Sequence, residues 1–152
     1  MIRGARLNDI PAFVELARAM HASSVYRDFV FSEQHLAGYL AMALDAPSRY
    51  CILVAEHGDR LVGFLAGYLE SFVFGPETIA YDTAFFVAPD HRGTTTAKRL
   101  IEAFRAWAID RGAREIGLGI STGLDDDRVG RLYERLGWSR SGVIYKQRID
   151  HG

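Results

Sequence analysis

The spacing of apolar and polar positions divides the chain into short strands and amphipathic helices. Strands are expected where β-branched and aromatic residues cluster, and helices where apolar residues recur every three or four positions. In chain order, the pattern predicts a strand at 1–7, helices after 9 and after 32, strands at 50–56, 61–74 and 78–87, a helix at 97–111, a strand at 113–120, a helix at 128–136, and final strands at 138–141 and 143–149. This β-α-α-β-β-β-α-β-α-β-β order indicates an α/β (α+β) fold with about four helices and six to seven strands.

The connections between these elements predict how the strands pair. The tight turn at 57–60 joins two strands into an antiparallel hairpin, whereas strand 78–87 reaches strand 113–120 through a helix, which favours a parallel pair with a right-handed crossover. On strand 113–120, Gly117 and Gly119 leave one face nearly bare. That face suits a ligand or a closely approaching backbone, or the strand is simply weakened by glycine and packs under a helix.

A run of small and hydroxyl residues separates strand 78–87 from the next helix. Pro89 ends the strand, and the run from Arg92 to Thr96 offers consecutive backbone N–H groups just before the helix. The first N–H groups of a helix have no internal partners and carry partial positive charge. Gly93 lets a ligand come close to the backbone, and Lys98 adds charge. The run therefore predicts an anion site, although a well-capped helix without a ligand would look the same.

Composition narrows the possible classes of function. The 152 residues are 49% hydrophobic and 24% charged with a net charge of −1, which predicts one globular domain over 1–152 and argues against nucleic-acid or anionic-membrane partners. The N-terminus lacks the apolar stretch of a signal peptide, so we expect a cytoplasmic protein. The single cysteine, Cys51, lies in an apolar run and is interpreted as buried rather than nucleophilic. Exposed edge strands in so small a domain are compatible with a homodimer.

The loop before the central helix resembles a known motif. The run V-A-P-D-H-R-G-T-T-T-A-K-R-L resembles the acyl-CoA-binding motif of the GNAT N-acetyltransferase superfamily, V-x-P-x-x-R/Q-x-x-G-x-G/A. Val87, Pro89, Arg92 and Ala97 match it in order and spacing. Thr95 departs from it, because the family usually has its middle glycine there; the β-branched side chain would crowd a ligand and restrict φ.

A second motif lies about forty residues later. The run R-L-Y-E-R-L-G-W resembles the GNAT signature L-Y-x-x-x-G-F/W, and its tyrosine is Tyr133. The element order also resembles that of the superfamily over essentially the entire chain. The resemblance implies a GNAT domain with a mixed, mostly antiparallel sheet. It further implies an acetyl-CoA-dependent N-acetyltransferase, without a metal, that acts on a primary amine of a small molecule or peptide by direct attack in a ternary complex.

The resemblance also implies roles for individual residues. The loop N–H groups would hold the CoA pyrophosphate and the main chain of the preceding strand would pair with the pantetheine arm. The cofactor-binding residues implied in this way are Phe86, Val87, Arg92, Gly93, Thr94, Thr95, Thr96, Ala97 and Lys98. Tyr133 would donate a hydrogen bond to the departing thiolate, and the N–H of Phe86 or Val87 would stabilise the oxyanion. Asp126 stands where many family members have an asparagine, and it cannot donate to a carbonyl.

The general base stays open at this stage. Asp82 is the first candidate, because it lies among apolar neighbours on the strand that leads into the loop, where an unpaired carboxylate needs a reason. Side chains alternate along a strand, so Asp82 and Tyr81 should face opposite ways. Further candidates are an ordered water and the side chains of Glu70, His21, Glu33 and His35.

Other interpretations remain. A non-catalytic acyl-CoA-binding or regulatory module would explain both Thr95 and Asp126, and a Tyr133→Phe change would slow an enzyme but leave such a module unchanged. A nucleotide-binding protein is more remote, because the loop is neither G-x-x-x-x-G-K-S/T nor G-x-G-x-x-G. The segment between the first two helices holds Tyr26, Phe29 and Phe31, which either form a wall of an acceptor pocket or pack onto the core.

Overall fold

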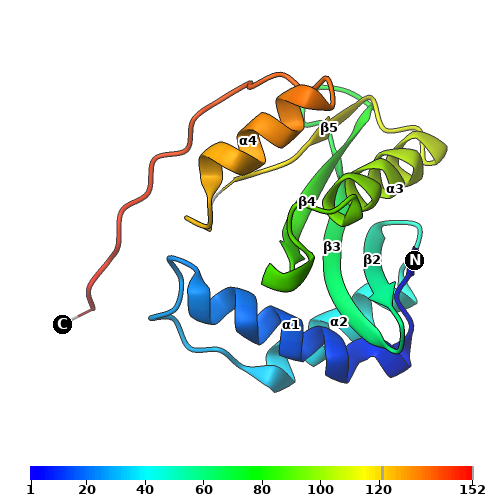
Figure 1. Cartoon of the computed structure of the whole chain (residues 1–152). Helices are drawn as coiled ribbons and strands as arrows, with labels where there is room; N and C mark the ends of the chain where they lie inside the picture. Colours follow the sequence, from blue (N-terminus) through cyan, green and yellow to red (C-terminus); the bar gives the residue numbers. More distant parts are fainter. Residues whose placement is uncertain (121, 152) are drawn as a thin grey trace.

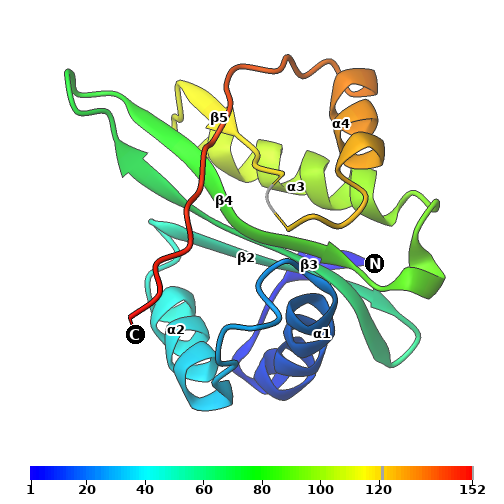
Figure 2. The same cartoon turned by 90° about the vertical axis from the view of Figure 1, so that its left-hand side faces the viewer.

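The computed structural model describes residues 1–120 and 122–151 and arranges them as one sheet between two layers of helices. In chain order the elements are β1 (Ile2–Gly4), η1 (Leu7–Asp9), α1 (Ile10–Ser23), α2 (Glu33–Asp45), β2 (Tyr50–His57), β3 (Arg60–Ser71), β4 (Thr78–Val87), η2 (Pro89–His91), α3 (Thr96–Asp110), β5 (Glu115–Gly117) and α4 (Asp126–Arg135). Helices α1 and α2 cover one face, and α3 and α4 lie over the other (Figure 1 and Figure 2). None of the helices in the described ranges is long and apolar enough to cross a membrane.

The five strands lie in the order β1-β2-β3-β4-β5, so strands that are consecutive in sequence are also neighbours in the sheet. The first four pair antiparallel, and β5 pairs with β4 in parallel after the crossover through α3. The mixed, mostly antiparallel sheet is therefore as predicted, and the element order is as predicted up to α4.

Each face of the sheet carries its own set of buried side chains. Helix α3 contributes an apolar stripe at helical spacing, made of Leu100, Ile101, Phe104 and Ala108, which packs on β2, β3 and β4. The opposite face is covered by α1 and α2, and its buried residues include Phe13, Leu40, Val54, Phe64 and Phe86. Strand β4 lies between the two layers, next to the edge strand β5, and its C-terminal end leads through η2 into the loop before α3.

Strands β4 and β5 pair over a short stretch and then separate. Their last paired residues are Tyr81 and Gly117, whereas β4 continues to Val87. Beyond Tyr81, this edge of β4 has no strand partner anywhere in the described ranges. The separation opens the sheet next to the loop that precedes α3.

The predicted pair of strands at the C-terminus is wrong. Residues 138–151 are extended but form no strand, so within the described ranges the sheet has five strands rather than six or seven. Figure 1 shows this segment leaving α4 and running down one side of the molecule, apart from the sheet. Alternating side chains favour an extended backbone, but a strand also needs a partner for its N–H and C=O groups, and the segment finds none in the sheet. Strand β5 is likewise shorter than the predicted 113–120.

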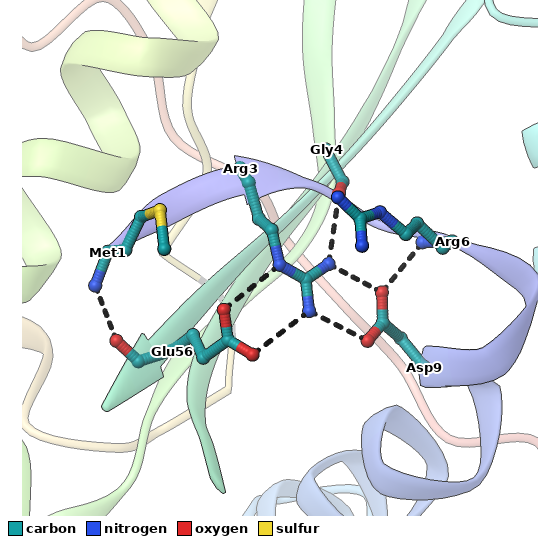
Figure 3. Close-up of polar contacts among 6 residues, drawn as sticks. All are labelled: Met1, Arg3, Gly4, Arg6, Asp9 and Glu56. Carbon is teal, nitrogen blue, oxygen red and sulfur yellow. Dashed lines mark hydrogen bonds and ion pairs between the residues drawn. The ribbon is translucent and has the colours of Figure 1, made fainter. Parts of the chain in front are cut away.

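A charged network joins the N-terminus to the sheet (Figure 3). The guanidinium of Arg3 donates two hydrogen bonds to Asp9, at 2.7 and 2.9 Å, and two to Glu56, at 3.1 and 3.3 Å. The Arg3 side chain is only 18% exposed. These hydrogen bonds lower the pKa of both carboxyl groups. The network ties β1, η1 and β2 together.

Cys51 lies buried in β2, as its apolar neighbours predict. Burial raises the pKa of its thiol to about 12. The nucleophilic thiolate form is therefore disfavoured at neutral pH.

Candidate active site

A cavity of about 260 Å³ lies where β4 separates from β5, between the loop before α3 and helix α4. It brings together most of the candidate residues. Those that line it are Asp82, Phe86, Val87, Arg92, Gly93, Thr94, Ala97 and Tyr133. Thr95, Thr96 and Lys98 are candidates that do not line it, and the Lys98 ammonium instead lies 3.6 Å from Glu102.

The loop presents free backbone N–H groups at one end of this cavity. The N–H of Thr96 donates to the Thr94 hydroxyl at 3.2 Å. Among the residues that the structure describes, no acceptor receives the N–H groups of Gly93, Thr94, Thr95, Ala97 or Lys98. Gly93 adopts φ +80°, which turns the backbone at the start of the loop. The arrangement fits an anion at the N-terminus of α3.

Thr95 fits the loop without backbone strain. Its φ of −75° and ψ of −3° are ordinary for any residue, so this position does not require the glycine that the motif usually has. The position that does require glycine is Gly93. The restriction on φ expected at Thr95 is therefore no obstacle to the loop conformation seen here.

Tyr133 lies on α4 with its side chain directed into the protein. It is only 7% exposed, and its hydroxyl has no hydrogen-bond partner within the described ranges. Burial, with a smaller effect of the Asp82 charge, raises the pKa of the phenol, so the hydroxyl stays neutral at physiological pH. A buried hydroxyl without a partner is costly in a folded protein, and here it lines the cavity.

Asp82 lies on the same side of the sheet as Tyr133, whereas Tyr81 faces the other way and contacts Gly117, as the alternation predicts. The Asp82 carboxylate accepts a hydrogen bond from the Gly119 N–H at 2.8 Å. Burial raises the pKa of this carboxyl, and the Gly119 hydrogen bond offsets part of that rise. The carboxylate is thus a stronger proton acceptor than an exposed aspartate.

Comparison with known families identifies the fold and the motifs. The model of the acetyltransferase (GNAT) family matches residues 12–138, which include both motifs. The chain belongs to the GNAT acetyltransferase family. The predictions of a GNAT protein and of an N-acetyltransferase are confirmed. A search of curated proteins gave no match.

Solved structures share the fold of this GNAT acetyltransferase over nearly their whole length. A ribosomal-protein-alanine N-acetyltransferase from Brucella melitensis biovar Abortus 2308 is 22% identical with a TM-score of 0.76, covering 98% of this chain and 99% of its own. Glucosamine-6-phosphate N-acetyltransferase from Arabidopsis thaliana is 16% identical with a TM-score of 0.79, and the match covers 99% of this chain and 98% of the Arabidopsis chain. AAC(6')-Iy in complex with the bisubstrate analog CoA-S-monomethyl-acetylneamine is 18% identical with a TM-score of 0.77, covering 98% of each chain.

The other candidate bases of this GNAT acetyltransferase lie outside the cavity lining. Glu33 pairs with Arg18 at 2.5 Å, and the imidazole of His21 packs against Phe31 with ring centroids 5.3 Å apart. Glu70 and His35 are exposed. Asp82 is thus the one carboxylate or imidazole among the proposed bases that the described structure brings to the cavity.

The aromatic segment between α1 and α2 contacts the C-terminal segment of the acetyltransferase rather than the cavity. The Arg148 guanidinium lies 4.2 Å from the centre of the Phe29 ring and donates to the Val25 carbonyl at 2.7 Å. The Lys146 ammonium lies over the Tyr26 ring and donates to its hydroxyl. Neither Tyr26 nor Phe29 lines the cavity, so they form no wall of it in this structure.

Sequence reasoning missed the contribution of α4 apart from Tyr133. Arg128, Val129 and Leu132 also line the cavity of the acetyltransferase. Val129 stands one helical turn before Tyr133, so the helical period would have predicted that it shares the same face. Asp125 precedes α4 with φ +52°, and its side chain makes no capping hydrogen bond.

Proposed function

We propose that the protein transfers the acetyl group of acetyl-CoA to a primary amine of a small molecule or peptide, by direct attack in a ternary complex. The observation that carries this proposal is the Tyr133 hydroxyl, which is buried, has no partner in the described structure, and lines the same cavity as the Asp82 carboxylate. The Tyr133 hydroxyl can donate a hydrogen bond, and the Asp82 carboxylate can accept a proton. Amine acetylation requires both functions.

The loop before α3 supports binding of acetyl-CoA. The N–H groups of Gly93, Thr94, Thr95, Ala97 and Lys98 have no protein acceptor in the described ranges and lie at a helix N-terminus, a combination suited to a pyrophosphate. A solved neighbour with the same fold contains a CoA-based bisubstrate analog. Acetyl-CoA supplies a thioester, whose acetyl carbon an amine can attack as the CoA thiolate leaves.

The open edge of β4 supports a place for the pantetheine arm. From Asp82 to Val87 this edge has no strand partner in the part of the chain that the structure describes. An extended amide-containing chain can add to such an edge through backbone hydrogen bonds. We propose that the backbone of Phe86 and Val87 binds the arm and that one of their N–H groups stabilises the oxyanion.

Asp82 and Tyr133 divide the proton chemistry in this proposal. Asp82 takes a proton from the acceptor amine, a role favoured by the rise in its pKa on burial. Tyr133 donates a hydrogen bond to the sulfur rather than transferring its proton completely, because burial raises the pKa of its phenol above that of an ordinary thiol. Both groups line the cavity.

A calorimetric titration with acetyl-CoA and with CoA, followed by an assay of thiol release with a panel of primary amines, tests the proposal. We expect micromolar binding and amine-dependent release of CoA with a product heavier by one acetyl group. Binding without turnover for any amine would favour the non-catalytic acyl-CoA-binding module. Failure of the folded protein to bind either ligand would overturn the proposal.

A further inference from the structure

The arginine of the CoA-loop motif is engaged with the protein itself. The Arg92 Nε donates to the Val87 carbonyl at 3.0 Å, and its guanidinium lies 5.4 Å from the centre of the Phe86 ring. The side chain thus joins the end of β4 to the start of the loop. An arginine held in this way supports the loop, and its charge is already directed toward a backbone carbonyl and an aromatic ring.

A second arginine approaches the same loop from α4. An ideal Cβ on Gly93 would lie 3.2 Å from Nη2 of Arg128, so this guanidinium stands directly beside the turn of the loop. Arg128 also lines the cavity, and its side chain is 49% exposed. The loop N–H groups and the Arg128 guanidinium therefore lie next to one another, although they come from α3 and α4.

The existing partner of Arg128 is weak. Its Nη1 lies 3.7 Å from the Asp125 carboxylate, and both side chains are about half exposed. Exposed ion pairs of this kind contribute little to stability, about 0–1 kcal/mol. A phosphate offers more charge and can accept two parallel N–H bonds from a guanidinium. Arg128 is thus available to an anionic ligand in a way that Arg92 is not.

We propose that Arg128 binds the pyrophosphate of acetyl-CoA, while Arg92 holds the loop in the binding conformation. This inference rests on the proposed function and adds a phosphate-binding residue from outside the loop motif. The guanidinium would add a charged donor to the N–H groups of a loop in which Thr95 replaces the usual glycine. Gly93 is needed both for its φ of +80° and for the space that Arg128 occupies.

Calorimetric titration of the full chain tests the assignment with three variants. Arg128→Ala should weaken acetyl-CoA binding at least about tenfold, as expected for loss of a charge-assisted hydrogen bond, and should leave the melting temperature unchanged. Arg131→Ala is the matched control, because it removes an exposed arginine from the same helix that does not line the cavity, and it should bind normally. Arg92→Ala should lower the melting temperature as well as weaken binding.

A second ligand distinguishes binding to the pyrophosphate of CoA from binding to its 3′-phosphate. Dephospho-CoA keeps the pyrophosphate and lacks the 3′-phosphate, so the loss caused by Arg128→Ala should persist with it. Equal affinity of Arg128→Ala and the unmodified protein for acetyl-CoA would overturn the inference. A loss that disappears with dephospho-CoA would also overturn it, by assigning Arg128 to the 3′-phosphate. Failure of the unmodified protein to bind acetyl-CoA would instead overturn the proposed function.

Discussion

The carboxylate of Asp82 accepts a hydrogen bond at 2.8 Å from the backbone N–H of Gly119, across the point where β4 and β5 separate. The side chain of one strand thereby engages the backbone beyond the other, where regular pairing has ended. The same carboxylate lines the cavity. Asp82 is thus placed both to join β4 to the segment that follows β5 and to act on a ligand in the cavity.

Asp82→Asn separates these two roles, because asparagine keeps an oxygen that can accept the Gly119 N–H but cannot take a proton. We expect the rate of acetyl transfer to fall about 10²-fold, as is typical for loss of a general base. Folding and acetyl-CoA binding should be retained, and Asp82→Ala, which loses both roles, should also lower the melting temperature. An unchanged rate in Asp82→Asn would rule out Asp82 as the base.

The pH profile gives an independent check on Asp82. The base must be deprotonated, and burial raises the pKa of the Asp82 carboxyl, so the rate should fall as the pH is lowered through that raised pKa. The fall should begin above the range of an ordinary aspartate, about 3.9. The rate should be measured as kcat/KM for the amine found by screening. The fall at low pH, which is the acidic limb of the profile, should be missing from Asp82→Asn. A limb that persists in the variant would belong to another group.

Tyr133→Phe should slow acetyl transfer without harming the fold. The hydroxyl has no partner in the described ranges, so its removal breaks no hydrogen bond and the melting temperature should stay the same or rise. Loss of a donor to the developing thiolate should lower kcat by roughly 10- to 100-fold, with acetyl-CoA affinity nearly unchanged. Unaltered turnover would show that the hydroxyl plays no part in the reaction.

Gly93→Ala should lower both stability and affinity. Gly93 and Gly112 have φ of +80° and +73°, and alanine in this region costs roughly 1–2 kcal/mol of folding free energy. Gly112→Ala is the matched control, because a Cβ there meets nothing within 4 Å, whereas a Cβ on Gly93 meets Arg128. Denaturant unfolding should show a similar loss for both variants, but only Gly93→Ala should weaken acetyl-CoA binding. Equal affinities would contradict the close approach of a ligand to this turn.

Arg3→Met should lower the free energy of unfolding by about 1 kcal/mol near neutral pH, since it removes charge-assisted hydrogen bonds in a partly exposed network. The pKa of Asp9 and of Glu56 is lowered in the fold, so their stabilisation is complete above their unfolded values, about 4, and is lost as the pH falls through the folded ones. Urea unfolding at several pH values should therefore show the two proteins converge in acid. A constant difference would mean that packing of the Arg3 side chain, rather than charge, stabilises this region.

Patterns in the sequence were sufficient to predict those elements of the fold that depend on residues close together in the chain. Helix α3 forms where an apolar stripe follows a run of small residues, and the turn at Gly93 follows from the freedom of glycine in φ. The parallel pairing of β5 follows from the helix between the strands. The C-terminal segment was predicted wrongly because its alternation gives an extended backbone but says nothing about a pairing partner.

The sequence by itself determined the family, the order of elements up to α4, and the loop and tyrosine that mark the candidate site, because these depend on residues close together in the chain. Only the tertiary structure decided which side chains meet. It brought Asp82 to Tyr133 and left the other proposed bases outside the cavity, and it directed Arg92 onto Val87 while Arg128 came to stand beside Gly93. These contacts join segments far apart in sequence, and their distances depend on how helices pack across a sheet that opens at one point.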